Sequence, residues 1–132
     1  MKKQKFIPII LFILSIILVM LNHYAGVYFL YWRFWWFDIV MHFLGGSIIS
    51  LLSIYIYKSF FGDFNDRRSI IVISFSLVFV FIVAIFWEVF EFFMDSNIKE
   101  ANYFLDTITD ILMAILGTLF TYNFFIGYNK KK

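Results

Sequence analysis

Three segments of the chain carry acidic residues, in one case with a histidine, at intervals of three or four. They are Asp38 and His42, then Glu88, Glu91 and Asp95, then Asp106 and Asp110. Residues three or four apart lie on the same face of a helix, so each set would project from a single stripe. Carboxylates with one imidazole can bind Mg²⁺, Mn²⁺ or, less well, Zn²⁺, and a series of Asp, Glu and His side chains can relay protons within a membrane. The pattern therefore indicates a cation or proton site, provided that the fold brings the three stripes together.

The composition of the chain indicates what kind of fold must position these residues. Of its 132 residues, 63% are hydrophobic and only 15% are charged. A soluble domain of this length needs a larger polar fraction to cover its surface, so the apolar excess must face lipid. The chain contains no cysteine, which excludes disulfides and thiolate-bound metals.

Four long stretches free of Asp, Glu, Lys and Arg are the candidate membrane spans. About 20 mainly apolar residues cross the hydrocarbon core as a helix, and backbone groups in lipid must be paired within the segment. The sequence therefore predicts an all-α integral membrane bundle of about four transmembrane helices, with spans at about 6–25, 38–57, 69–93 and 105–127. Residues 1–132 are expected to form a single transmembrane domain. The first span is expected to stay uncleaved, because Asn22, His23 and Tyr24 are too bulky for a signal-peptidase site.

The distribution of Lys and Arg predicts the orientation of the bundle. Nine of the eleven basic residues lie before the first span, between the second and third, or after the fourth: Lys2, Lys3, Lys5, Lys58, Arg67, Arg68, Lys130, Lys131 and Lys132. Only Arg33 and Lys99 belong to the opposite side. Basic residues favour the cytoplasmic side, so we expect both termini to be cytoplasmic and the protein to lie in a cell membrane, with the prokaryotic cytoplasmic membrane favoured.

Threading the chain through four spans brings the three acidic stripes to the same, outer end of the bundle. The expected cation- or proton-binding residues are Asp38, His42, Glu88, Glu91, Asp106 and Asp110, and the narrower metal-ligand set is His42, Glu88, Glu91 and Asp110. The alternative interpretation is a group of solvated helix ends. That alternative accounts for Asp38, Asp95 and Asp106. It accounts poorly for Glu88, Glu91 and Asp110, which lie further into the spans, where ionisable groups are costly.

Small residues on the second and fourth spans predict close helix packing behind these stripes. Gly46, Ser50 and Ser53 recur on the second span, and Ala114 with Thr118 and Gly117 with Thr121 form small-x-x-x-small pairs on the fourth. Such pairs let two helices in a membrane approach closely.

An aromatic connector of residues 24–37 joins the first two spans, and nine of its fourteen residues are Phe, Tyr or Trp. Trp and Tyr favour the headgroup level of a bilayer. The expected interface anchors are Trp32, Trp35, Trp36 and Trp87. The alternative is a lid that lies along the membrane and shapes an entry for a lipid.

Three runs of sequence carry a resemblance to known families: residues 38–46 (DIVMHFLGG), 87–91 (WEVFE) and 106–110 (DTITD), followed by Gly117. Their order and spacing resemble the YjdF-like bacterial inner-membrane proteins. They are also similar to the VanZ-like family, which pairs an Asp-x-x-x-His helix with a Glu-bearing helix and an Asp-plus-Gly helix. The resemblance covers about residues 37–119. It implies a multi-pass envelope protein whose biochemical activity is largely undefined.

Two classes of function fit these observations, and the sequence leaves open whether the protein is an enzyme. In the first, an outer-facing cluster binds a cation or relays protons without catalysis. In the second, the cluster holds a divalent cation for a hydrolase or transferase that acts on a lipid headgroup or envelope precursor. The sequence contains no phosphate-binding loop, no Ser nucleophile elbow and no nucleic-acid motif. The candidate cofactor is Mg²⁺, Mn²⁺ or Zn²⁺, and the candidate partners are the lipid bilayer, a lipid or envelope ligand and a second copy of the chain.

The predicted orientation can be tested by labelling single cysteines in intact cells. Cysteines at Gly26 and Asn97 should react with a membrane-impermeant thiol reagent, because both positions are expected on the outer side. Cysteines at Asn65 and Asn129 should react only after permeabilisation. The cysteine-free parent provides the blank, and labelling of position 65 in intact cells would contradict the orientation.

Overall fold

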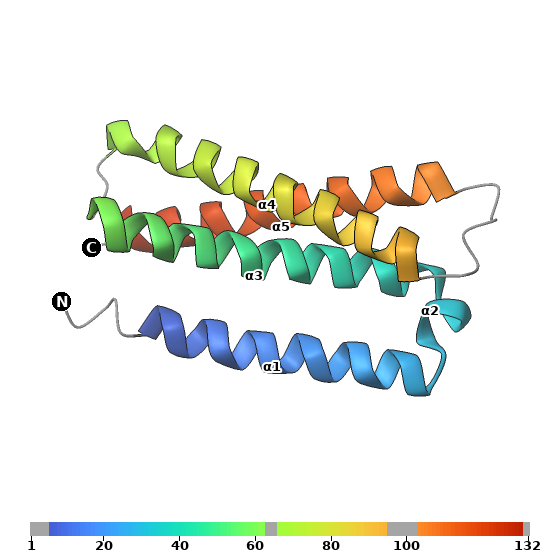
Figure 1. The fold of residues 1–132 in the computed structure, drawn as a ribbon. Helices are drawn as coiled ribbons and strands as arrows, with labels where there is room; N and C mark the ends of the chain where they lie inside the picture. The colour runs from blue at the N-terminus through green and yellow to red at the C-terminus, as the bar shows by residue number, and fades with distance from the viewer. Residues whose placement is uncertain (1–5, 63–65, 95–102, 131–132) are drawn as a thin grey trace.

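The computed structural model describes residues 6–62, 66–94 and 103–130, with side chains described over 6–62, 69–93 and 103–124. Within these ranges the chain forms five α-helices and no strand (Figure 1): α1 (Phe6–Val27), α2 (Leu30–Arg33), α3 (Trp35–Phe61), α4 (Asp66–Met94) and α5 (Tyr103–Lys130). Four segments are long and apolar enough to cross a membrane: Phe6–Val27, Trp35–Phe61, Ser69–Phe93 and Tyr103–Phe124. The predicted all-α bundle of four spans is confirmed.

The long helices run alternately up and down, so that α1 begins and α5 ends at the same end of the bundle (Figure 1). The beginning of α3, the end of α4 and the beginning of α5 lie at the opposite end, together with α2. Helix α3 begins at Trp35, three residues before the predicted start of the span, because the aromatic connector itself continues into the helix. The assignment of the terminal end to the cytoplasm stays a prediction from charge. Positions 65 and 97 lie outside the described residues.

Helices α3 and α5 run parallel and pack at backbone contact. A Cβ atom added to Gly46 would overlap the backbone of Ala114, and one added to Gly117 would overlap the carbonyl oxygen of Phe43. The Ser47 hydroxyl lies in the same contact, at 2.8 Å from the carbonyl oxygen of Phe43 and 3.2 Å from that of Gly117. Small residues thus permit an approach that larger side chains would prevent.

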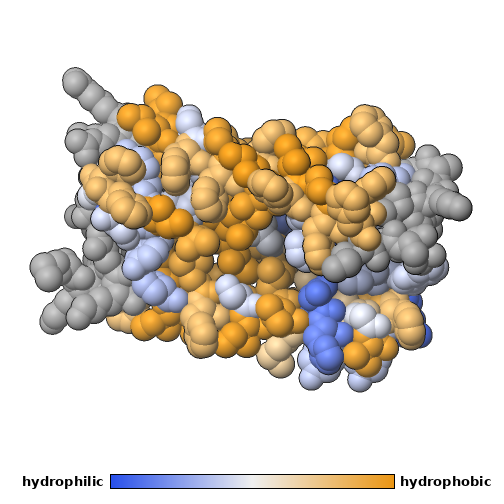
Figure 2. Space-filling view, in the orientation of Figure 1, coloured by the Kyte–Doolittle hydropathy of each residue, from blue (hydrophilic) through white to orange (hydrophobic). Residues whose placement is uncertain are grey.

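Buried polar side chains join the helices deeper in the bundle. The hydroxyls of Ser53 on α3 and Ser76 on α4 are fully buried and lie 2.6 Å apart. Near the terminal end, the Tyr122 hydroxyl of α5 lies 2.7 Å from the carbonyl oxygen of Ser69 on α4. Many large apolar side chains face outward instead, and Figure 2 shows a surface dominated by hydrophobic residues. This arrangement suits a protein whose surrounding solvent is lipid.

Helix α1 is set apart from the other spans. Within the described residues it packs against α2 and α3, but none of its Cα atoms comes within 8 Å of one in α4 or α5. The Tyr31 hydroxyl on α2 donates a hydrogen bond to Asn22 Oδ1 on α1 at 2.7 Å, which ties the connector to the end of the first span. The chain turns between these helices at Phe29, which adopts a left-handed backbone with φ of 53°.

The α3–α5 contact predicts different outcomes for two adjacent glycines. Gly46→Ala should lower the free energy of unfolding by about 1–3 kcal/mol, because the added methyl forces the two helix backbones apart. Gly45→Ala is the matched control, since a Cβ there would meet nothing within 4 Å. Thermal unfolding of both variants in one detergent provides the comparison. Equal stability of the two variants would show that the helices do not pack this closely.

Candidate functional site

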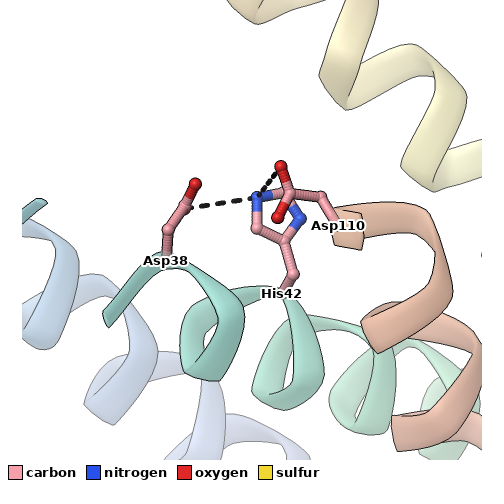
Figure 3. A group of neighbouring side chains, drawn as sticks. All are labelled: Asp38, His42 and Asp110. Carbon is pink, nitrogen blue, oxygen red and sulfur yellow. Dashed lines mark ion pairs between the residues drawn. The ribbon is translucent and has the colours of Figure 1, made fainter. Parts of the chain in front are cut away.

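The end of the bundle that holds α2 also gathers the acidic stripes predicted from the sequence. Asp38 and His42 come from the first turns of α3, and Asp110 comes from the second turn of α5 (Figure 3). His42 Nε2 lies 3.4 Å from Asp38 Oδ1 and 3.7 Å from Asp110 Oδ2. A single imidazole therefore bridges carboxylates from two helices.

Two more carboxylates reach the same histidine from α4. His42, Glu88 and Glu91 each offer a ligand atom, and these three atoms lie within 4.8 Å of one another. The ligand atoms of Asp38, His42 and Asp110 also lie within 4.8 Å of one another, so His42 belongs to both groups. We call these five residues, Asp38, His42, Glu88, Glu91 and Asp110, the His42 cluster. Its donor atoms come from three helices that are separated in the sequence.

Two carboxylates of the cluster are buried, and its other three residues are partly exposed. The exposed fraction is 3% for Asp110 and 7% for Glu88. Within the described residues, Glu88 Oε1 is buried without a well-formed hydrogen bond, and so is Thr107 Oγ1 on α5, the side chain with which Glu88 interacts. Leaving a buried carboxylate oxygen unpaired is costly. A proton or a cation would remove that cost.

The charge of the cluster is unbalanced. Within the described residues, no Lys or Arg forms an ion pair with any of its four carboxylates, which leaves His42 as the only group that can carry positive charge there. Carboxylates held this close repel one another when ionised, and the repulsion is strong where the local dielectric constant is low. The arrangement favours binding of protons or of a metal cation.

Five of the six predicted site residues belong to the two candidate metal groups, and Asp106 lies near them without belonging to either. Its side chain is exposed on the first turn of α5 and belongs to neither candidate metal group. The helical spacing of four placed Asp106 and Asp110 on one face, but Asp106 lies a turn closer to the end of the bundle. Asp38 was open to interpretation as a solvated helix end, and it instead contacts His42. Asp95 lies outside the described residues.

A cavity of about 380 Å³ lies beside the cluster, between α1, α3 and α4. Asp38, His42 and Glu91 line its polar end, together with Asn22 and Tyr31. Burial, and then the negative charges of Asp38 and Glu91, raise the pKa of the Tyr31 phenol to about 12. The phenol therefore stays protonated at neutral pH and remains the donor to Asn22.

Sequence reasoning missed this cavity because its wall includes α1, which carries no acidic stripe. Ser15, Leu18 and Val19 of α1 face it. Polar Ser15 and Asn22, seven residues apart within an apolar span, were the only sequence signal.

The four tryptophans expected at the interface are exposed. The exposed fraction is 77% for Trp32 and 80% for Trp35, and it is lower for Trp36 and Trp87. Trp87 also lines the cavity, so it contacts both the outside of the bundle and the space beside the cluster. Anchoring at the headgroup level stays a prediction.

The fold and the cluster define a multi-pass helical membrane protein with a polar site between its helices. The chain belongs to the family described as predicted membrane protein (DUF2238), to which residues 2–131 match. No curated protein and no solved structure matches the chain. The family description specifies a membrane protein and no reaction, so the function has to be argued from the site.

The unpaired Glu88 oxygen predicts that the cluster is destabilising in the absence of a cation. In buffer with EDTA, Glu88→Gln should raise the free energy of unfolding by about 1–3 kcal/mol, because burial of an uncompensated charged oxygen costs at least this much. Asp106→Asn removes the same charge from an exposed position and should change stability little. The melting temperatures of parent and variants provide the measurement. If Glu88→Gln were destabilising in EDTA, the carboxylate would be satisfied by contacts within the protein.

Proposed function

We propose that the protein is a multi-pass membrane protein of the cell envelope that binds a divalent cation in the His42 cluster, on the outer side of the membrane. The observation that carries this proposal is Glu88: its buried Oε1 has no well-formed hydrogen bond within the described residues, and the residue belongs to a candidate ligand group with His42 and Glu91. Carboxylate oxygens dominate the donor set, which favours Mg²⁺ or Mn²⁺, with Zn²⁺ less well suited.

In this proposal the two groups that share His42 have different roles. Glu88 and Glu91 supply carboxylate ligands from successive turns of α4, and the imidazole supplies a nitrogen from α3. Asp38 Oδ1 and Asp110 Oδ2 lie at ion-pair distance from Nε2, at 3.4 and 3.7 Å, and would hold the ring in place. Metal-bound histidines commonly use their second nitrogen in this way. Asp110 is also close enough to serve as a ligand itself.

Two alternatives use the same residues. A relay of protons is favoured by the succession Asp38, His42, Asp110, whose members are held at ion-pair distance across two helices. A metal-dependent hydrolase or transferase acting on a lipid headgroup is favoured by the cavity, which reaches His42 and Glu91. In that case a metal-bound water would be the nucleophile, which would explain why the sequence has no nucleophile motif.

The likeness of residues 38–46, 87–91 and 106–110 to YjdF-like and VanZ-like proteins supports an envelope role. Those runs supply all five residues of the His42 cluster. Because the resemblance implies no defined reaction, it supports the location of the site more than its chemistry. Cation binding accounts for the cluster without requiring a substrate.

Titration with Mn²⁺ tests the proposed cation site. Binding to the purified protein in detergent should raise the melting temperature, by an amount equivalent to about 2.7 kcal/mol at 100 times Kd. Asp110→Asn should weaken binding by about 10–100-fold if Asp110 orients the histidine, and Glu91→Gln should weaken it at least as much. Electron paramagnetic resonance of free Mn²⁺ gives the affinity directly.

Asp106→Asn is the control for this titration, because Asp106 is outside the cluster. Its Mn²⁺ affinity should fall much less than that of Asp110→Asn, because Asp106 belongs to neither ligand group. A parent protein that ignores Mn²⁺, Mg²⁺ and Zn²⁺ but changes stability with pH would favour the proton relay over the cation site.

A further inference from the structure

The cavity beside the His42 cluster is amphipathic along its length. One end is lined by Asp38, His42 and Glu91 of the cluster. Away from that end the wall is apolar except for Ser15, and it comes from three helices, represented by Val19 of α1, Ile48 of α3 and Val83 of α4. Its volume of about 380 Å³ falls in the range of small-molecule sites, which are also mostly apolar with a few convergent polar groups.

The position of the cavity makes it accessible to lipid rather than to water alone. It lies within the segments that can span a membrane, between α1 and α4, two helices that have no close backbone contact within the described residues. Figure 2 shows a hollow in this face of the molecule, above α1. Since the surrounding surface is apolar, a hydrocarbon chain could enter from the bilayer without leaving an apolar environment.

The charge at the polar end limits which headgroup can bind there. Four carboxylates and one histidine would repel an anionic headgroup in the absence of a cation. A divalent cation bound to the cluster reverses that preference, because Mg²⁺ and Mn²⁺ in proteins are commonly held by one or two carboxylates together with phosphate oxygens. His42 and Glu91 belong both to the candidate ligand set and to the cavity wall, so the cation would face the cavity.

We infer that the cavity binds a phosphate-bearing lipid, with the phosphate coordinated to the cation and the hydrocarbon chain along the apolar wall between α1 and α4. This inference rests on the proposed cation site. The Tyr31 hydroxyl and the Asn22 amide lie at the polar end of the cavity and are placed to meet the headgroup. Recognition then requires both the cation and the apolar space.

Hexadecyl phosphate is a suitable probe, and Gly45 offers a way to fill the cavity from its own wall. Gly45 lines the cavity, and a Cβ atom there meets nothing within 4 Å. Gly45→Leu should therefore project into the apolar space. Gly26→Leu is the matched control, because Gly26 also has open space around it and does not line the cavity.

Native mass spectrometry of the full chain, with Mn²⁺ or with EDTA, measures the binding of hexadecyl phosphate. The parent and Gly26→Leu should bind it with Mn²⁺ and lose it in EDTA. Gly45→Leu should lose the hexadecyl phosphate complex while it still binds Mn²⁺ in the absence of amphiphile. Binding of hexadecyl phosphate that is equal in EDTA, or equal in Gly45→Leu, would overturn the inference.

A second measurement keeps the test decisive if Gly45→Leu fails to fold. In the cysteine-free chain, Val83→Cys places a thiol on the cavity wall, and Val78→Cys places one on the exposed surface of α4. Hexadecyl phosphate with Mn²⁺ should slow alkylation of the first thiol and leave the second unchanged. Protection by hexadecyltrimethylammonium in EDTA instead would assign the cavity to cationic amphiphiles. Absence of Mn²⁺ binding without any amphiphile would refute the cation site itself.

Discussion

The close approach of α3 and α5 is the contact on which the geometry of the site depends. The two helices run parallel, and Gly46 meets the backbone of Ala114. His42 and Asp110 each lie four residues, about one turn, before these contact residues. Because the helices are parallel, the two side chains one turn before the contact also lie side by side, with His42 Nε2 at 3.7 Å from Asp110 Oδ2. A bulkier residue at position 46 would separate the helices and, with them, the two halves of the cluster.

The membrane environment explains why this contact is built from small and polar residues. Lipid tails are as apolar as Leu, so burying apolar side chains between helices gains little, and packing and hydrogen bonding must hold the bundle together. The buried positions accordingly include Ser53, Ser76 and Thr118, while many Phe and Ile side chains face outward. Helix α1 makes fewer such contacts, which leaves room for the cavity between α1 and α4.

The spans and most of the site could be predicted from the sequence because both depend on local pattern. Hydrophobic length sets where helices cross, and spacings of three and four set which residues share a face. Spacing does not show which residues of a face pack against a neighbouring helix, and Asp106, one turn nearer the helix end than Asp110, is exposed. The cavity depends on how α1 packs against helices distant in sequence, which no local pattern reports. The orientation of the bundle in the membrane is predicted from the distribution of Lys and Arg, and the packing of the helices does not test it.

The His42 cluster places ionisable side chains between membrane-spanning helices, which costs free energy. A single charged side chain at the centre of a span costs roughly 2.5–3.5 kcal/mol on insertion scales, and the His42 cluster holds five ionisable groups near one end of the bundle. Solvation explains a carboxylate that faces water, but Glu88 and Asp110 are buried between helices. The close packing of α3 against α5 offsets part of this cost. Helix α1 contacts only α2 and α3 within the described residues, which leaves the cavity open beside the cluster. A bundle that only needed to fold would be more stable with apolar residues at these positions, and this cost supports the proposal that the cluster binds a cation or protons.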